Sequence, residues 1–222
     1  DIDSIISYLL QGLIIQRDLK RIRLACPRNL PIFRIVSLLD RHFHANYIGY
    51  GASRLPVLAI YAIYRSLIDD GQQRYVGMQL LPLESHTSAD ARSGRIGDVD
   101  VARADGSTFE AVEVKFDINV EYNIVETAKQ KILSSKAERY YILSTKEPLE
   151  QDMDMINSEI ESLKNVHGCE LIINGILPTI KYYLRLLRNP QHFVDNYVEL
   201  MGTDAAIKFE HKDMWNKLIA SL

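Results

Sequence analysis

Cysteine, tryptophan and long apolar runs are all scarce in this chain of 222 residues. Its two cysteines, Cys26 and Cys169, are too few and too isolated for a disulfide framework or a zinc site, so a reducing cytoplasm is the simplest setting. No apolar run reaches the ~18 residues of a membrane span, and we therefore expect no membrane partner. Positive charge is not in excess either, because the net charge is −3, which argues against a non-specific binder of polyanions.

The composition is that of an ordinary globular protein, with 47% hydrophobic and 25% charged residues and no internal repeat. The length suits one core with a helical addition. Hydrophobic residues recur at helical spacing through much of residues 1–50. We therefore expect a helical N-terminal extension over residues 1–52 and a core over residues 53–222.

Hydrophobic patterning over residues 53–145 predicts a helix, three strands, a helix and a strand, in that order. The first helix is apolar nearly all round and should be buried, with Ser53 as its N-cap. The expected elements are a helix over 55–68, a strand over 74–83, a hairpin over 95–116, a helix over 122–135 and a strand over 140–144. Residues 146–222 add further helices and one strand.

The hairpin over residues 95–116 has the clearest pattern. Valines alternate with other residues on both sides of an Asp105-Gly106 dipeptide, which favours a tight turn because glycine tolerates positive φ. If Asp105 and Gly106 form a two-residue loop, Asp98 lies opposite Glu113 and Asp100 lies opposite Ala111.

This register places Asp98, Asp100, Glu113 and Lys115 on one face of the sheet, because residues two apart share a face. Three carboxylates are costly to bury unless a positive charge compensates them, and oxygen ligands of this kind suit Mg²⁺. A neighbouring lysine could orient or deprotonate a metal-activated water. The simpler alternative is a hydrated, solvent-facing hairpin, although three acids against one lysine is an unbalanced surface.

The same residues resemble the motif of the PD-(D/E)XK nuclease superfamily, in which an acid on one strand precedes an acid-x-Lys triplet on the next. Glu113-Val114-Lys115 matches the triplet. We favour Asp100 as the leading acid, in the segment Gly97-Asp98-Val99-Asp100, with Asp98 as the alternative. The chain departs from the nominal pattern because no proline precedes either aspartate.

The resemblance implies an α/β (α+β) fold of the restriction-endonuclease type. Its αβββαβ core, over residues 53–145, would form a central mixed sheet flanked by helices, with helical additions at both ends. The activity implied is Mg²⁺-dependent hydrolysis of DNA phosphodiester bonds, with Mn²⁺ as a possible substitute. Asp100 and Glu113 would hold the metal, with Asp98 as the alternative ligand or a supporting partner, and Lys115 would position the attacking water.

Among the branches of this superfamily, the chain looks most like a type II restriction endonuclease. That likeness implies double-stranded DNA as the partner, a homodimer, and a cytoplasmic location in a prokaryotic cell.

Residues around the hairpin supply further candidates for substrate binding. A polar loop over residues 84–94 leads into the hairpin, and loops at the edge of a rigid scaffold often carry binding groups. Glu84, His86 and Arg95 are therefore candidates for contact with metal, water or phosphate. Gln130 is a candidate because the family often places a polar residue of the following helix near the site. An ordinary surface role is the alternative for each of them.

Three other functions remain open at this point. A repair or recombination nuclease of the same superfamily would act on DNA structure rather than on sequence. A metal-dependent glycosyltransferase would use Asp98-Val99-Asp100 as a D-x-D motif, but it would need a parallel sheet and would leave Glu113 and Lys115 without a role. An inactive nuclease-like domain would only bind DNA.

Overall fold

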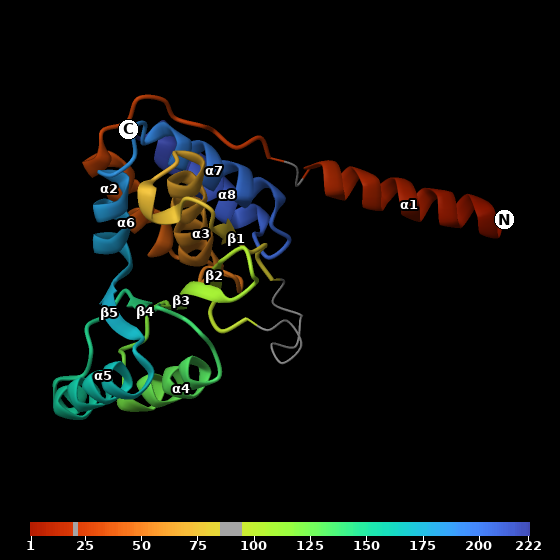
Figure 1. Cartoon of the computed structure of the whole chain (residues 1–222). Coiled ribbons are helices and arrows are strands. Elements are labelled where there is room, and N and C mark those ends of the chain that lie inside the picture. The colour runs from red at the N-terminus through yellow and green to blue at the C-terminus, as the bar shows by residue number, and fades with distance from the viewer. Residues whose placement is uncertain (20–21, 85–94) are drawn as a thin grey trace.

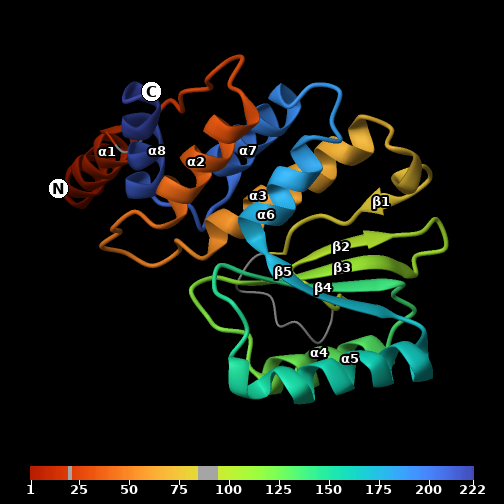
Figure 2. The ribbon, with the colours of Figure 1, turned by 90° about the vertical axis from the view of Figure 1, so that its left-hand side faces the viewer.

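The structure is a computed structural model that describes residues 1–19, 22–84 and 95–222, with only the backbone described for residues 13–19. It shows a mixed α/β protein in which a five-stranded sheet lies between two layers of helices (Figures 1 and 2). The strands follow one another in chain order across the sheet. No helix in the described part of the chain is long and apolar enough to cross a membrane.

The order of elements from α3 to β4 is helix, three strands, helix and strand, as the sequence predicts. Parallel strands β4 and β5 and four helices complete the fold after α4. The elements are α1 (Ile2–Leu19), α2 (Ile32–Phe43), α3 (Arg54–Asp69), the 3-10 turn η1 (Gln73–Tyr75), β1 (Gln79–Leu80), β2 (Val99–Ala102), β3 (Thr108–Lys115), α4 (Tyr122–Leu133), β4 (Arg139–Ser144), the 3-10 turn η3 (Glu150–Asp152), α5 (Met153–His167), β5 (Glu170–Gly175), α6 (Ile176–Leu184), α7 (Gln191–Thr203) and α8 (Phe209–Ala220).

One local expectation before the hairpin is wrong and another is confirmed only in part. Most of the expected strand over residues 74–83 is not extended, because η1 occupies its start and Gly77 has a φ of +77°, so that only β1 pairs with β2. Ser53 occupies the N-cap position of α3, as expected, but its side chain makes no capping hydrogen bond. Instead, the backbone carbonyl of Gly51 accepts a hydrogen bond from the amide of Arg54 at 3.0 Å.

The sheet changes direction at β3. Strands β1, β2 and β3 pair antiparallel, whereas β3, β4 and β5 pair parallel. A short turn joins β2 to β3, while α4 and α5 provide the long connections that parallel neighbours require. The carboxyl ends of β3, β4 and β5 therefore lie at one edge of the sheet.

Each face of the sheet has its own layer of helices and its own core. Helices α4 and α5 cover one face, and α3 and α6 lie on the other, with α2, α7 and α8 beyond them (Figure 2). Alternation along β4 divides its side chains between the two cores: Tyr140 and Ile142 belong to the α4–α5 side, and Tyr141 and Leu143 to the α3–α6 side.

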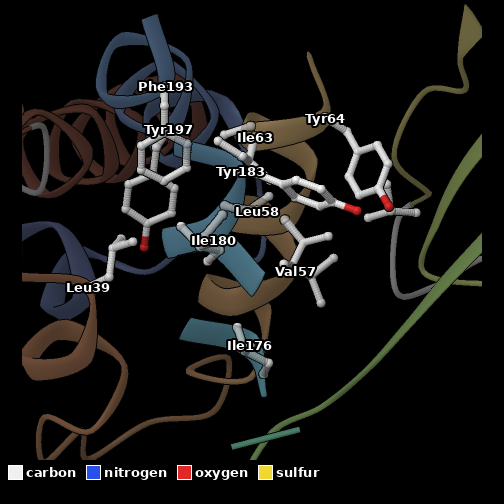
Figure 3. Packing of buried hydrophobic residues seen from close by; sticks show 14 of the residues in the cluster. Leu39, Val57, Leu58, Ile63, Tyr64, Ile176, Ile180, Tyr183, Phe193 and Tyr197 are labelled. Carbon is white, nitrogen blue, oxygen red and sulfur yellow. The ribbon is translucent and has the colours of Figure 1, made fainter. Parts of the chain in front are cut away.

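Helix α3 is the centre of the larger core. Its side chains are buried almost all round, which confirms the interpretation of its sequence. Figure 3 shows Leu58 and Ile63 of this helix among Ile180 of α6 and Tyr197 of α7. Burying one leucine such as Leu58, which has no exposed surface, contributes about 1.5–3 kcal/mol.

The two N-terminal helices differ in their surroundings. Helix α1 extends away from the rest of the molecule, and its apolar side chains up to residue 12 are exposed (Figure 1). Helix α2 packs against α6 and α8, and its Leu38 and Leu39 belong to the same cluster as α3. The helices on both sides of residue 52 therefore share one hydrophobic core.

Candidate active site

The hairpin between β2 and β3 contains two irregularities whose effects on the strand register cancel each other. Arg103 donates its amide to the carbonyl of Ser107 at 2.8 Å, so the loop has three residues, with Gly106 at a φ of +80°, rather than the two that we expected. The register then shifts by one residue between Val101 and Ala102. Beyond this bulge, Asp100 pairs with Ala111, as predicted from the sequence.

Consequently the four expected site residues share one face of the sheet. Val99, Val101 and Val112 point into the core beneath α3. The residues that alternate with them, Asp98, Asp100, Glu113 and Lys115, therefore point to the side that α4 covers. The prediction that these charges share a face is confirmed.

Glu113 lies between two lysines. Its Oε1 atom is 2.7 Å from Nζ of Lys115, and its Oε2 atom is 2.9 Å from Nζ of Lys131 on α4. The hydroxyl of Tyr140, on β4, lies 3.2 Å from the same Oε2 atom. Burial raises the pKa of Glu113, but the hydrogen bonds from the two lysines outweigh burial and hold the pKa below its ordinary value.

Asp100 is fully buried beside the backbone of Gly97. Its Oδ2 atom accepts a hydrogen bond from the amide of Ile96 at 3.0 Å, whereas Oδ1 accepts none of good geometry within the described ranges. Burial raises the pKa of Asp100 to about 6. A side chain at position 97 would collide with this arrangement, because its Cβ would lie 2.8 Å from the carbonyl oxygen of Val112.

Asp98 holds the hairpin together at its open end. Its Oδ2 atom accepts a hydrogen bond from the amide of Val114 at 2.8 Å, and its own amide donates to the carbonyl of Val112 at 2.8 Å. Burial raises the pKa of Asp98, and the negative charge of Glu113 raises it further. One carboxylate oxygen of Asp98 is thus engaged in backbone pairing, which suits a supporting role beside the other two acids.

Lys131, rather than the expected Gln130, is the residue of α4 that contacts Glu113. It lines a hollow of about 240 Å³ together with Glu113, Lys115 and Thr127. Its position was readable, because it follows the buried Ala128 by three residues and therefore lies on the same side of α4. The expected helix residue, Gln130, is instead exposed and is not among the residues that line this hollow.

The structure describes two of the three candidates for substrate binding in the polar loop, Glu84 and Arg95. Nε of Arg95 lies 3.3 Å from Oε1 of Glu84, and Arg54 donates a hydrogen bond to the Glu84 carbonyl at 2.9 Å. This pairing brings residues 84 and 95 together. The positive charge of Arg95 lowers the pKa of Asp100, which places it near the site, although burial is the larger influence and raises that pKa. His86 lies outside the described residues.

A divalent metal at this group of carboxylates would have about two protein ligands. Within residues 1–19, 22–84 and 95–222, no three histidine, cysteine, aspartate or glutamate side chains gather closely enough to hold an ion by themselves. Mg²⁺ commonly binds through one or two carboxylates and completes its shell with water and substrate phosphate. The buried Oδ1 atom of Asp100, which lacks a hydrogen-bond donor in the described structure, fits a cation ligand of this kind.

The chain matches no known family model and has no significant match among curated proteins.

Proposed function

We propose that the protein is an Mg²⁺-dependent DNA endonuclease of the PD-(D/E)XK type. The observation that carries the proposal is the joint placement of Asp98, Asp100, Glu113 and Lys115 on the sheet face under α4, with the acid-x-Lys triplet on β3. The order of elements from α3 to β4 and the mixed direction of the sheet also support a restriction-endonuclease-like core.

The balance of charge at this face favours a bound cation. Asp98, Asp100 and Glu113 carry three negative charges when ionised, and Lys115 and Lys131 carry two positive ones, which leaves a net charge of −1. Burial holds the pKa of Asp100 at about 6, so its ionised form is costly until a positive charge comes near. A metal ion would supply that charge.

In the proposed reaction, Asp100 and Glu113 would hold Mg²⁺, with Asp98 supporting them through its bond to the β3 backbone. When bound, the ion supplies a water of lowered pKa and positive charge at the scissile phosphate. Lys115 would orient the attacking water by a hydrogen bond. Tyr140 would hold the Glu113 carboxylate in place, and Lys131, displaced from that carboxylate by the ion, would be available to bind a phosphate group.

The finer assignment follows from the resemblance in the sequence. A type II restriction enzyme would act on double-stranded DNA as a homodimer, and a structure-specific repair nuclease would use the same chemistry. The glycosyltransferase alternative is disfavoured, because Asp100 lies in an antiparallel hairpin and its neighbours on the same face include Glu113 and Lys115. The active alternatives differ in their products, since only a sequence-specific enzyme cuts DNA into discrete fragments.

The deciding experiment is cleavage of supercoiled plasmid by the purified protein in Mg²⁺, Mn²⁺, Ca²⁺ and EDTA. We expect cutting in Mg²⁺ and Mn²⁺ and none in Ca²⁺ or EDTA, because Ca²⁺ accepts a looser ligand geometry and activates water poorly. The Glu113→Gln variant should be inactive, whereas Lys129→Ala should keep full activity, because Lys129 pairs with Glu159 at 2.7 Å, away from the hollow. Equal cutting in EDTA would refute the metal-dependent mechanism, and loss of cutting only in Lys129→Ala would place the site elsewhere.

A further inference from the structure

A second hollow, of about 680 Å³, lies on the opposite side of the sheet from Glu113. Side chains of η1, β4 and α6 line it, including Tyr141 and Tyr183. Tyr140, which contacts Glu113, and Tyr141 are neighbours on β4 and point to opposite faces of the sheet. The sheet therefore separates this hollow from the candidate active site.

The charged side chains that line the second hollow are both positive. Arg74 and Arg139 contribute to its wall, and among the residues that the structure describes no aspartate or glutamate does. Beneath them lies one carboxylate, that of the fully buried Glu110, whose Oε1 atom is 2.9 Å from Nε of Arg74 and 3.8 Å from Nη1 of Arg139. One carboxylate between two guanidinium groups leaves a net charge of +1 facing the hollow. The contact between Arg139 and Glu110 is too long for a hydrogen bond, and the Arg139 side chain is 40% exposed, so this five-donor group keeps donors for a ligand.

The arginine nearest the carboxylate is held rigidly. Oε2 of Glu110 accepts a hydrogen bond from the hydroxyl of Tyr75 at 3.0 Å, and the hydroxyl of Tyr64 lies 3.4 Å away. The guanidinium of Arg74 also stacks over the ring of Phe109, with 4.8 Å between its central carbon and the ring centroid. A group fixed in this way loses little conformational entropy when an anion binds.

The outer wall of the hollow presents an aromatic platform. The Tyr182 side chain is 52% exposed. The guanidinium of Arg185 lies 4.8 Å from the centroid of its ring, and the ring of Tyr183 meets it edge-on at 5.8 Å. An exposed tyrosine beside arginines is the combination that stacks on planar bases in proteins that bind nucleotides and single strands.

We propose that this second hollow binds a nucleoside monophosphate, with the phosphate at Arg139 and Arg74 and the base stacked on Tyr182. The volume lies within the ~300–1,000 Å³ of small-molecule sites. The arginines match a phosphate, the tyrosine matches a flat ring, and Gln73, which also lines the hollow, carries a side-chain amide that can donate and accept hydrogen bonds. The site is independent of the nuclease chemistry, because it lies on the other face of the sheet.

The test is calorimetric titration of the purified chain with AMP, GMP, CMP and UMP, and with inorganic phosphate and adenosine as separate probes. We expect at least one of the monophosphates to bind with a dissociation constant in the micromolar to low millimolar range. Arg139→Gln should weaken binding about tenfold, because it removes a charged donor to phosphate. Tyr182→Ala should weaken it about fivefold or more, through loss of stacking. Lys181→Gln is the matched control, since Lys181 precedes Tyr182 on α6 but does not line the hollow.

Variants at the other face separate this site from the candidate active site. Glu113→Gln should bind the nucleotide as tightly as the wild type, and circular dichroism should show that all variants are folded. Binding that is lost in Glu113→Gln but kept in Arg139→Gln would move the nucleotide to the hairpin face and overturn the proposal. So would the absence of heat with any monophosphate up to ~5 mM, beyond the range expected of a built site.

Discussion

Lys131 lies 2.9 Å from Glu113, and this contact joins helix α4 to strand β3 at the centre of the candidate active site. Because Lys115 lies 2.7 Å from the other oxygen of the same carboxylate, both oxygens of Glu113 are engaged by lysines. A cation that binds there must compete with them. The two lysines then become available to a negatively charged substrate. Metal binding at Glu113 would in this way favour phosphate binding by the lysines.

Lys115→Ala should separate a catalytic hairpin from a merely hydrated one. If Lys115 orients the attacking water, plasmid cleavage should fall by ~10²–10⁴, the usual cost of losing a positioned proton-transfer group. The unfolding free energy should also fall, because the mostly buried Glu113 carboxylate loses one of its two lysine partners; if the hairpin is merely hydrated, the change should stay below about 0.5 kcal/mol. DNA affinity, measured in Ca²⁺, should survive. If the variant cuts at the wild-type rate, the assignment of the active site to this hairpin is wrong.

Lys131→Ala should change the pH dependence of cleavage. Burial raises the pKa of Asp100 to about 6, against the positive charge of Lys131, and hydrogen bonds from Lys115 and Lys131 lower the pKa of Glu113 despite its burial. Both pKa values should rise when Lys131 is removed. Because both carboxylates must be ionised to hold a metal, the acid limb of the rate profile, which follows the higher pKa, should move to higher pH. Lys129→Ala, on the same helix, should leave the limb in place. Identical acid limbs for Lys131→Ala and the wild type would show that the charge of Lys131 does not act on the carboxylates that control the rate.

Asp100→Asn should abolish cleavage and yet stabilise the fold at high pH. Burial raises the folded-state pKa of Asp100 to about 6 from its ordinary value of 3.8, so its stabilising effect is complete below pH 3.8 and is lost as pH rises through 6. At pH 8 the wild type therefore carries an unfavourable buried charge worth up to about 3 kcal/mol, which asparagine lacks.

Urea unfolding at pH 8, with and without Mg²⁺, would test this expectation. Mg²⁺ should stabilise the wild type and not Asp100→Asn, because an ion that binds only the folded state adds to its stability. A variant less stable than the wild type at pH 8 would contradict the buried-charge account, and equal stabilisation of both proteins by Mg²⁺ would exclude Asp100 as a ligand.

His42 should make the protein sensitive to acid. It is fully buried, with Nε2 at 2.9 Å from the His211 carbonyl and Nδ1 at 3.2 Å from the Tyr197 hydroxyl, and burial lowers its pKa to about 4. In the unfolded chain, His42 takes up a proton as the pH falls below about 6.5, whereas in the folded protein it stays neutral down to about pH 4. The free energy of unfolding should therefore fall by about 3 kcal/mol between pH 6.5 and 4.

The check is the slope of unfolding free energy against pH in His42→Phe, compared with the wild type. The unfolding free energy of the variant should depend less steeply on pH than that of the wild type, whatever the absolute stability of the variant. Ser37→Ala is the control, since Ser37 is exposed on the same helix and carries no group that titrates in this range. An unaltered slope in His42→Phe would show that another group carries the acid sensitivity.

The sequence by itself determined the local features of this protein. Alternating valines placed Asp98, Asp100, Glu113 and Lys115 on one face, because the two-residue period of a strand is a local property. Apolar residues all round α3 likewise predicted its burial. These expectations needed no contact between distant segments. They held even where the turn was misjudged, because the bulge at Val101 restored the register.

Only the tertiary structure decided which distant groups meet those carboxylates. Lys131 lies 18 residues from Glu113 along the chain, and α4 brings it there only after crossing the sheet between two parallel strands. Glu110 appeared as one more polar residue on β3, yet two arginines and two tyrosines surround it, because η1 and α3 pack on that face. Charge burial depends on such long-range neighbours, and the period of a strand does not encode them.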